Sequence, residues 1–414
     1  MQPDGIAFVM LTRASKYAGQ ARGPGTPYDS YKQSLPFRVK ESVMSTIPSV
    51  EEFRAFFVEE YERGAREIET TDAIPAALLK RAAELGVYRL TIPPEYGGWG
   101  LPVTDYLPYL EAAAMGHGSG RMLMHLTNGV WRPLASYGSE EQRRLVPAMS
   151  TGEKVVAFCL TELAGGTGRD LHSRAQRATG GWTVSGEKHL ITFADRADVF
   201  LLVVATDDRR AKDSLTAFLV PRATAGFEVD ATQRTMGLHG TGHAWLRYRD
   251  VFVPDSAVLG AVGQGLEVAL SFLDYSRVSL SNCMVGMAQR ALDEAVSFAK
   301  RRTTFGRPIA DRQAMQAHIA DMHADVSAGR GLVRLAAEKC SNGEDFTADA
   351  ATAKLFCLNM IGRVTDKSLR VHGGYGYTTD APIERIYRDA RGFWFEEGTA
   401  EIQQLVVARH VLDR

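Results

Sequence analysis

The spacing of apolar residues changes twice along this 414-residue chain, and these changes restrict the possible fold more than any other feature of the sequence. In the N-terminal third, apolar residues recur every three or four positions, as at Phe53, Phe56 and Phe57, which predicts amphipathic helices. After Gly152, short β-branched or aromatic runs separated by turns predict six to eight strands. From about Gly265 the helical spacing returns and continues to the C-terminus. We therefore expect a mainly α chain with a central β-barrel or β-sandwich and a C-terminal four-helix bundle.

These changes suggest where the domains begin and end. We expect an N-terminal helical domain at 44–154, a middle β-domain at 155–264 and the C-terminal bundle at 265–414. Residues 1–43 are poor in apolar side chains and lack a regular spacing, so we expect them to be disordered, with Met44 as an alternative start.

Composition and short motifs exclude several classes of function. The net charge of -1 favours neither nucleic acid nor a membrane surface, and no apolar run approaches the roughly 18 to 20 residues of a membrane span. The four cysteines lack CxxC spacing and no HExxH motif occurs, so we expect no metal site and a cytoplasmic protein with reduced thiols. A Rossmann dinucleotide site and a P-loop are also excluded, because neither glycine motif occurs.

Two stretches of the middle domain have the residue types of a ligand site. Residues 158–167 run from a strand into a glycine-rich loop, whose backbone N–H groups can meet a flavin or phosphate oxygen. Residues 186–192 follow a strand and end on Ile191 and Thr192, which can contact a heterocycle. An ordinary loop and a plain β-hairpin are the alternatives.

Three stretches of the C-terminal part are similarly unusual. Residues 301–308 end a helix with basic side chains that suit a pyrophosphate, and Gln313 opens the next helix. Residues 370–377 place three glycines after a long helix, where a helix end needs one. In 273–277 an acid and a base can grip a polar ligand, although Asp274 can equally be a helix cap.

A pair of carboxylates, Glu396 and Glu397, runs into Gly398 near the C-terminus, just before an apolar helix. A carboxylate on such a turn can face a cavity. The alternative is a solvated acidic helix start, stabilised by the helix dipole.

Taken together, these stretches resemble the acyl-CoA dehydrogenase family of flavoproteins from about Val50 to Arg414. The family patterns C-x-T-E-P-G-A-G-S, G-x-K-x-W-I-T, R-x-x-F-G, Q-x-x-G-G and Y-E-G-T are matched at 159–167, 186–192, 302–306, 370–374 and 396–399. Residues 137–142 and 260–265 match further signatures. The resemblance implies FAD held between the β-domain and the bundle, with part of the site from a neighbouring subunit, usually in a homotetramer that is a dimer of dimers. It also implies an acyl-CoA or acyl-carrier thioester as substrate and an electron-transfer flavoprotein as acceptor.

The resemblance assigns three groups of residues. The flavin ring would lie against Phe158, Leu160, Thr161, Ile191 and Thr192. The pyrophosphate and adenosine would meet Arg302, Phe305, Gln313, Arg370, Gly373, Gly374, Thr399 and Glu401. The thioester substrate would meet Thr167, Asp274, Arg277, Gly398 and Arg409.

Glu397 matches the general base of the family. As it takes the α-proton, the β-hydride passes to flavin N5 and leaves a trans-2-enoyl thioester. Some relatives place the base at the residue before Arg277, but this residue is Ser276 here.

The chain also departs from the family patterns. In the loop at 159–167, Leu163 replaces the proline and Ala164 replaces the first glycine, and Gly168 replaces the following aspartate in a loop that is one residue short. Leu190 replaces a tryptophan expected on the flavin, and Arg370 replaces a glutamine. Glu396 replaces a tyrosine, and its charge should raise the pKa of one of the two adjacent carboxyls. We interpret these changes as a specialised substrate or carrier. Arg121 could bind a terminal carboxylate of the substrate, but we expect a solvated helix arginine.

Two other functions remain open from the sequence. The same fold serves flavin monooxygenases and oxidases on amino sugars, nitroalkanes or aromatics, although the monooxygenases typically lack the base. A non-catalytic flavin- or thioester-binding protein is the other alternative.

Overall fold

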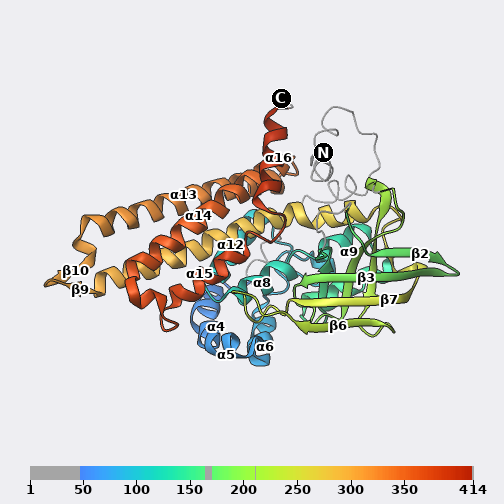
Figure 1. Cartoon of the computed structure of the whole chain (residues 1–414), viewed down its shortest axis with the longest axis horizontal. Coiled ribbons are helices and arrows are strands. Elements are labelled where there is room, and N and C mark those ends of the chain that lie inside the picture. The colour runs from blue at the N-terminus through green and yellow to red at the C-terminus, as the bar shows by residue number, and fades with distance from the viewer. Residues whose placement is uncertain (1–46, 164–169, 210, 413–414) are drawn as a thin grey trace, which may run out of the picture.

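A computed structural model describes residues 47–163, 170–209 and 211–412 of the chain. It contains a helical N-terminal part, a central sheet and a C-terminal set of long helices, as the spacing of apolar residues predicts (Figure 1). The expected disorder of residues 1–43 concerns residues outside the described ranges.

The N-terminal part consists of short helices that begin with a reciprocal cap. The Ser49 hydroxyl accepts a hydrogen bond from the Glu52 N–H, and the Glu52 carboxylate accepts one from the Ser49 N–H. Phe53, Phe56 and Phe57 are buried on one face, as their spacing predicts. The helices are α3 (Val50–Ala55), the π-helical η2 (Phe56–Glu60), α4 (Tyr61–Arg63), α5 (Ala65–Thr71), α6 (Ala76–Leu85), α7 (Val103–Ala114), α8 (Gly118–Thr127), α9 (Trp131–Tyr137), α10 (Glu140–Arg143) and α11 (Leu145–Ser150).

The middle part is one sheet of eight strands, in the order β6-β7-β3-β2-β4-β5-β8, with β1 paired in parallel to β4. The strands are β1 (Val156–Cys159), β2 (Arg174–Ala178), β3 (Gly181–Ile191), β4 (Val199–Ala205), β5 (Leu215–Pro221), β6 (Phe227–Thr232), β7 (Ala244–Pro254) and β8 (Val258–Leu259). Every residue of β4 is buried, because its alternate side chains enter two different cores. One core lies against α9, α11 and the start of α12, and the other lies within the sheet domain.

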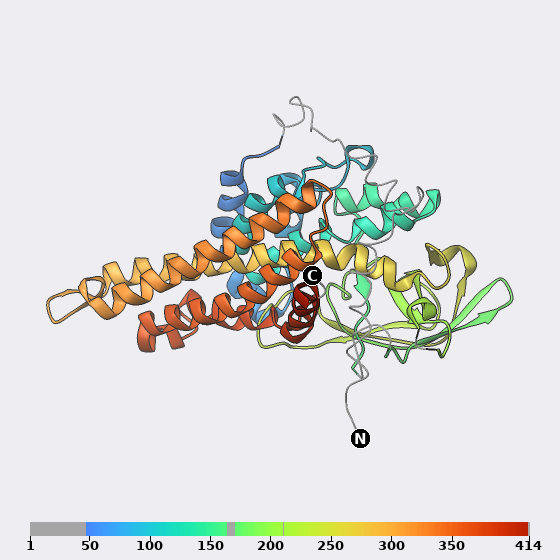
Figure 2. The same cartoon turned by 90° about the horizontal axis from the view of Figure 1, so that it is seen from above.

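Three long helices form most of the C-terminal part, α12 (Gly265–Arg301), α13 (Gln313–Ser341) and α14 (Thr347–His372). The hairpin of β9 (Thr303–Thr304) and β10 (Arg307–Pro308) joins the first two at the tip of the bundle. Two shorter helices follow, α15 (Pro382–Gly392) and α16 (Ala400–Leu412). In both views α12 runs from beside the sheet to the distant tip, and the N-terminal helices pack against it (Figures 1 and 2). Gln313 opens α13, as the sequence predicts.

Asp274 lies inside α12, several residues after its start at Gly265. The alternative that Asp274 caps this helix is therefore wrong. No helix among the described residues is long and apolar enough to cross a lipid bilayer.

Candidate active site

Glu397 lies in the short turn that joins α15 to α16, and its backbone is left-handed, with φ of 54°. Gly398 is left-handed as well, with φ of 89°. The conformation suits glycine, but for a glutamate it costs on the order of 1–3 kcal/mol and persists only where surrounding contacts enforce it. The Glu397 side chain is 11% exposed.

Two buried side chains hold this turn from neighbouring helices. The Lys354 ammonium of α14 donates to the carbonyl oxygens of Glu396 and Gly398. The Gln403 amide of α16 donates to the carbonyl oxygens of Glu397 and Gly398, at 3.3 Å each. Lys354 and Gln403 are both fully buried. The peptide groups around Glu397 are thus fixed by interactions that cross between helices.

Glu396, by contrast, is engaged through its side chain. Its two carboxylate oxygens each accept a hydrogen bond of 2.7 Å from the guanidinium of Arg121 on α8. Arg121 is fully buried, with its guanidinium 4.2 Å from the centre of the Phe393 ring. This geometry is the bidentate arrangement that arginine and carboxylate favour.

One expectation from the sequence is wrong at this pair. Arg121 is not solvated, because Glu396 and Phe393 enclose it. The expected rise in the pKa of one of the two adjacent carboxyls does not occur at Glu396: burial acts to raise this pKa, but the charge and hydrogen bonds of Arg121 outweigh burial and hold it below its usual value. Both terminal nitrogens of Arg121 are already engaged by Glu396, which argues against a terminal carboxylate of the substrate as their partner.

A buried histidine, His125, lies beside the Glu397 carboxylate. His125 Nε2 is 3.8 Å from Glu397 Oε1 and 3.0 Å from the Ser276 hydroxyl. Its Nδ1 is 3.1 Å from the Ser279 hydroxyl. On the same helix as the two serines, Arg277 donates to Asp274 at 2.6 Å. Glu397 therefore lies among polar groups of α8, α12, α14 and α16.

The predicted flavin-ring residues gather where β1 and β3 end. The Thr161 carbonyl accepts a hydrogen bond from the His189 N–H at 2.9 Å, which joins the two segments. Phe158 packs on Phe272 of α12, with ring centres 5.2 Å apart. Leu160 and Ile191 are buried, whereas Thr161 is exposed and Thr192 is partly exposed.

A buried ion pair fixes this end of the sheet. Lys188 Nζ donates to Glu162 at 2.8 Å and to the Leu160 carbonyl at 2.9 Å, and both charged side chains are buried. Glu162 also accepts hydrogen bonds from the backbone N–H groups of His172, at 2.5 Å, and Ser173, at 3.2 Å. Burial acts to raise the pKa of Glu162, but the charge of Lys188 and these donors lower it overall.

The loop between β6 and β7 lies against α15, where the Leu238 N–H donates to Asp389 at 2.6 Å. His243 ends this loop just before β7, with Nδ1 2.8 Å from the Thr241 hydroxyl, and the next residue, Ala244, is in register with Ile191. Burial lowers the pKa of His243 to about 4, while the charges of Glu396 and Arg121 act on it in opposite directions.

The predicted pyrophosphate and adenosine residues lie mostly elsewhere. Arg302, Phe305 and Gln313 surround the β9–β10 hairpin at the tip of the bundle, far from the sheet (Figure 1). Arg370, Gly373 and Gly374 end α14 near the same tip, because Phe298 on the last turns of α12 packs on His372 and Tyr375. Within one chain, these six residues do not lie near Glu397.

The tip residues have open surroundings. Phe305 is 96% exposed and left-handed, with φ of 50°. A Cβ atom added at Gly373 or Gly374 would meet nothing within 4 Å. An aromatic ring so exposed in a left-handed turn is suited to contact a ligand or a second subunit.

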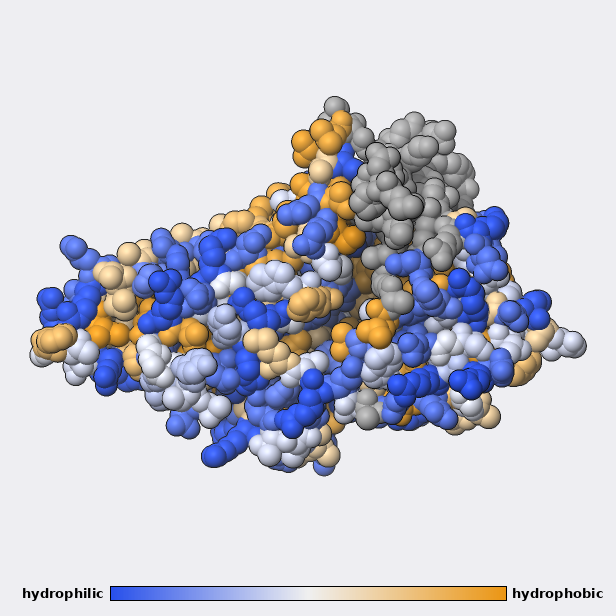
Figure 3. All heavy atoms as spheres, viewed as in Figure 1, coloured by the Kyte–Doolittle hydropathy of each residue, from blue (hydrophilic) through white to orange (hydrophobic). Residues whose placement is uncertain are grey.

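The remaining predicted residues belong to α16 or lie outside the described ranges. Thr399 and Glu401 are exposed at the start of α16, and a hydrogen bond from Thr399 lowers the pKa of Glu401. Arg409 is partly exposed further along this helix. Thr167 lies outside the described residues. Apolar side chains gather on the surface around α16, where Val411 and Leu412 are exposed (Figure 3).

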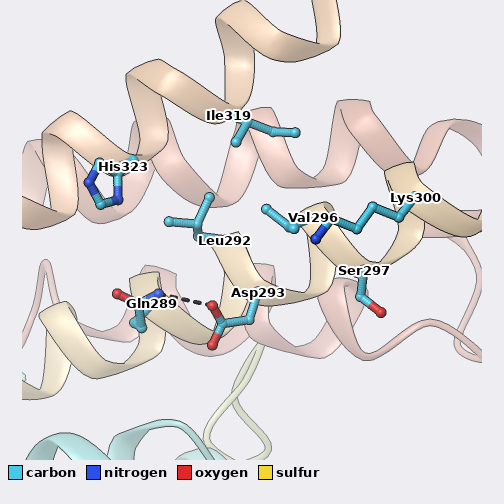
Figure 4. A pocket seen from close by; sticks show the side chains of 8 residues that line it. All are labelled: Gln289, Leu292, Asp293, Val296, Ser297, Lys300, Ile319 and His323. Carbon is cyan, nitrogen blue, oxygen red and sulfur yellow. Dashed lines mark hydrogen bonds between the residues drawn. The ribbon is translucent and has the colours of Figure 1, made fainter. Parts of the chain in front are cut away.

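A groove between α12 and α13 is separate from this site. Leu292 and Val296 of α12 face Ile319 of α13 across it, and none of the predicted site residues lines it (Figure 4). No cluster of three potential metal ligands occurs among the described residues.

Sequence reasoning missed Lys354 and His125 as members of the site. Both are polar residues at core-facing positions of otherwise apolar helices, as in the buried series Ala350, Lys354, Leu358. A lysine that interrupts such a series was a usable signal, because an unpaired charge is not tolerated in a core.

Comparison with known proteins identifies the family and the fold. Models of the N-terminal, middle and C-terminal domains of acyl-CoA dehydrogenases match residues 49–153, 157–251 and 263–412. The human mitochondrial short-chain specific acyl-CoA dehydrogenase is 34% identical over 351 residues, which cover 84% of this chain and 85% of that protein.

Two solved structures have the same fold over most of the chain. The structure of butyryl-CoA dehydrogenase from Megasphaera elsdenii superposes with a TM-score of 0.85 at 28% identity, covering 91% of this chain and 100% of that one. A chain from a structure described as the electron-transferring flavoprotein of Acidaminococcus fermentans gives a TM-score of 0.85 at 29% identity, covering 92% and 100%. The matched domains and the relatives together show that this chain belongs to the acyl-CoA dehydrogenase family.

Proposed function

We propose that this oxidoreductase of the FAD-dependent acyl-CoA dehydrogenase family converts a saturated acyl thioester, on CoA or on an acyl carrier, into the trans-2-enoyl thioester, with Glu397 as the base. The observation that carries this proposal is the Glu397 carboxylate itself, nearly buried and held in a left-handed turn beside the end of the sheet. A proton acceptor that must meet one carbon atom benefits from such restraint.

Glu397 has to remove the α-proton of a thioester, which is a very weak acid. Hydrogen bonds to the thioester oxygen stabilise the developing negative charge, and desolvation of the carboxylate strengthens it as a base. The Glu397 backbone N–H is the donor that this chain would contribute. The carboxylate is positioned by Lys354 and Gln403, while Arg121 neutralises the adjacent Glu396. When bound, FAD accepts the β-hydride.

The predicted flavin-ring residues and the residues at the bundle tip have side chains suited to the two parts of FAD. Phe158, Leu160, Thr161, Ile191 and Thr192 offer apolar surface and backbone or hydroxyl groups for the flavin ring. The basic and amide side chains at the tip, Arg302, Gln313 and Arg370, suit a pyrophosphate. Because one chain holds these groups at opposite ends, we propose that each FAD lies between two subunits of a homotetramer built as a dimer of dimers.

The shared site makes a prediction about mixed oligomers. Subunits carrying Glu397→Gln and subunits carrying Arg302→Glu should each be inactive alone. A mixed dimer has two sites. One of them combines the intact Glu397 of the Arg302→Glu subunit with the intact Arg302 of the Glu397→Gln subunit, and is therefore functional. Random mixing therefore restores about a quarter of wild-type activity. The measurement is turnover after co-expression with two affinity tags. Mixed dimers with no more activity than the separate variants would show that the site lies within one chain.

Substrate and acceptor complete the proposal. Asp274, Arg277, Gly398 and Arg409, with Thr167, are the residues we propose for the thioester and its carrier. An electron-transfer flavoprotein is the proposed acceptor, which the similarity to the A. fermentans structure supports.

Anaerobic titration of the purified protein tests the reaction directly. We expect one of a panel that includes butyryl-, isobutyryl- and glutaryl-CoA to bleach the flavin absorbance near 450 nm, with glutaryl-CoA the least effective because Glu396 occupies Arg121. A yellow protein that no thioester bleaches, but that reoxidises rapidly in air after chemical reduction, would instead indicate an oxidase or monooxygenase. A colourless protein that cannot be reconstituted with FAD would contradict the cofactor assignment.

A further inference from the structure

Lys354 is an unusual residue for the interior of a helical bundle. It lies in the middle of α14 between buried apolar neighbours, and its side chain is fully buried. Transfer of an ammonium group into such a site costs several kcal/mol, which the protein must offset by specific interactions. The partners of Lys354 therefore indicate what it does.

Those partners are the two carbonyl oxygens on either side of the proposed base. Lys354 Nζ donates to the carbonyls of Glu396 and Gly398, so it spans the peptide groups that set the left-handed conformation of Glu397. Of the acids whose charges act on Lys354, Glu397 favours the ammonium most. Lys354 meets the residues assigned to the thioester at the backbone carbonyl of Gly398.

We propose that Lys354 is a positioning residue for Glu397: its ammonium fixes the turn that aims the carboxylate and places a positive charge beside it. The inference rests on the proposed role of Glu397 as base. It explains why a lysine is present where an apolar residue would pack at no electrostatic cost.

The charges around Lys354 determine how its role depends on pH. Glu397 and Glu396 in the turn favour the ammonium, whereas Arg277 on α12 disfavours it. Asp274 pairs with Arg277, and His125 on α8 lies beside Glu397. Gln403 of α16 contributes only a neutral amide. Burial dominates and lowers the pKa of Lys354 to about 7, so the ammonium is lost within the range in which the enzyme can be assayed.

The effects of this proton on turnover and on stability have opposite signs. Deprotonation above about pH 7 removes the charge beside Glu397, so turnover should decline. For stability, the folded pKa of about 7 lies below the ordinary value of 10.5, so the unfolded chain binds the proton more readily between these values. The cost of burying Lys354 therefore falls as the pH rises from 7 towards 10.5. A purely structural role predicts no parallel decline in turnover.

The experiment compares Lys354→Met, Lys354→Gln and the control Lys339→Met, each with normal FAD content. Lys339 pairs with Asp349 on the bundle surface, at 2.7 Å, and belongs to no part of the site. We expect Lys354→Met to lower kcat about 100-fold, with KM changing less than about threefold, since the change affects the base and not the bound thioester. The decline of kcat above pH 7 should disappear in both Lys354 variants. Lys354→Gln retains a donor without the charge and should recover part of the lost kcat.

Three results would overturn the proposal. One is a Lys354→Met enzyme with wild-type kcat and pH profile; another is a change of the same size in Lys339→Met. If Lys354→Met does not fold, the pH profile of the wild-type enzyme tests the proposal instead. A wild-type kcat that does not change between pH 6 and 9 excludes the proposed role of Lys354. Failure of the base assignment is separate, since it would appear as an active Glu397→Gln enzyme.

Discussion

Replacing Glu397 with glutamine lowers turnover by about 10²–10⁴-fold, the range that a general base contributes. The amide has nearly the same size and can still accept a hydrogen bond, but it cannot take the α-proton. The rate of anaerobic flavin bleaching by the best thioester measures the effect. Binding of FAD and of the thioester should change little, because the turn is held through backbone carbonyls that the variant retains.

Glu338→Gln is the matched control for this variant. Glu338 lies on the surface of α13, where it pairs with Arg334 at 2.8 Å, so its replacement should leave bleaching unchanged. A Glu397→Gln enzyme that still bleaches at the wild-type rate would contradict the base assignment. His125, with Nε2 only 3.8 Å from the Glu397 carboxylate, would then be the first residue to test as proton acceptor.

Replacing the fully buried Arg121 with methionine destabilises the protein by about 3–5 kcal/mol, because the Glu396 carboxylate, only 16% exposed, loses its cation. Urea unfolding at pH 7 measures this change. Arg334→Met is the control: its side chain is 79% exposed, so the loss of its pair with Glu338 should cost less than about 1 kcal/mol. Similar losses in both variants would mean that the Arg121–Glu396 pair contributes no more than a surface pair.

The pH dependence and a second substitution separate charge from packing. In the wild type, the pKa of Glu396 is below its ordinary value of 4.5, so its stabilising contribution is complete above that pH and is lost as the pH falls. In Arg121→Met, the largest effect that opposes burial is removed, so the pKa of Glu396 should rise. The difference in unfolding free energy should therefore be largest at neutral pH and smaller near pH 4. Adding Glu396→Gln should recover most of the loss at pH 7, because no buried charge remains.

Much of the architecture was accessible from local patterns. The change in apolar spacing predicted the helical, sheet and helical parts, and the basic run at Arg301, the amide of Gln313 and the glycines after His372 mark helix ends as expected. Each of these signals depends on residues close in sequence, for which spacing and turn chemistry are reliable guides.

The buried polar contacts of the site could not be predicted from such local patterns. Arg121 and Glu396 are 275 positions apart, and nothing near Arg121 in the sequence indicates that a carboxylate and the Phe393 ring will enclose it. Base rates favoured a solvated arginine and were wrong here. The lowered pKa of Glu396 could not be predicted for the same reason, because only its neighbour Glu397 was visible in the sequence, whereas the dominant partner comes from another domain.

The contacts of Glu162 affect how the length of the chain can vary next to it. Its carboxylate accepts hydrogen bonds from the backbone N–H groups of His172 and Ser173, and Lys188 anchors it to β3. Glu162 and His172, the residues on either side of 163–171, are therefore held together. For a segment with pinned ends, the entropy of closure changes only slowly with the number of residues, by about 0.6 kcal/mol for each doubling. An insertion or deletion of one residue between 163 and 171 therefore shifts no strand of the sheet. The one-residue deletion relative to the family pattern lies in sequence between these two fixed ends.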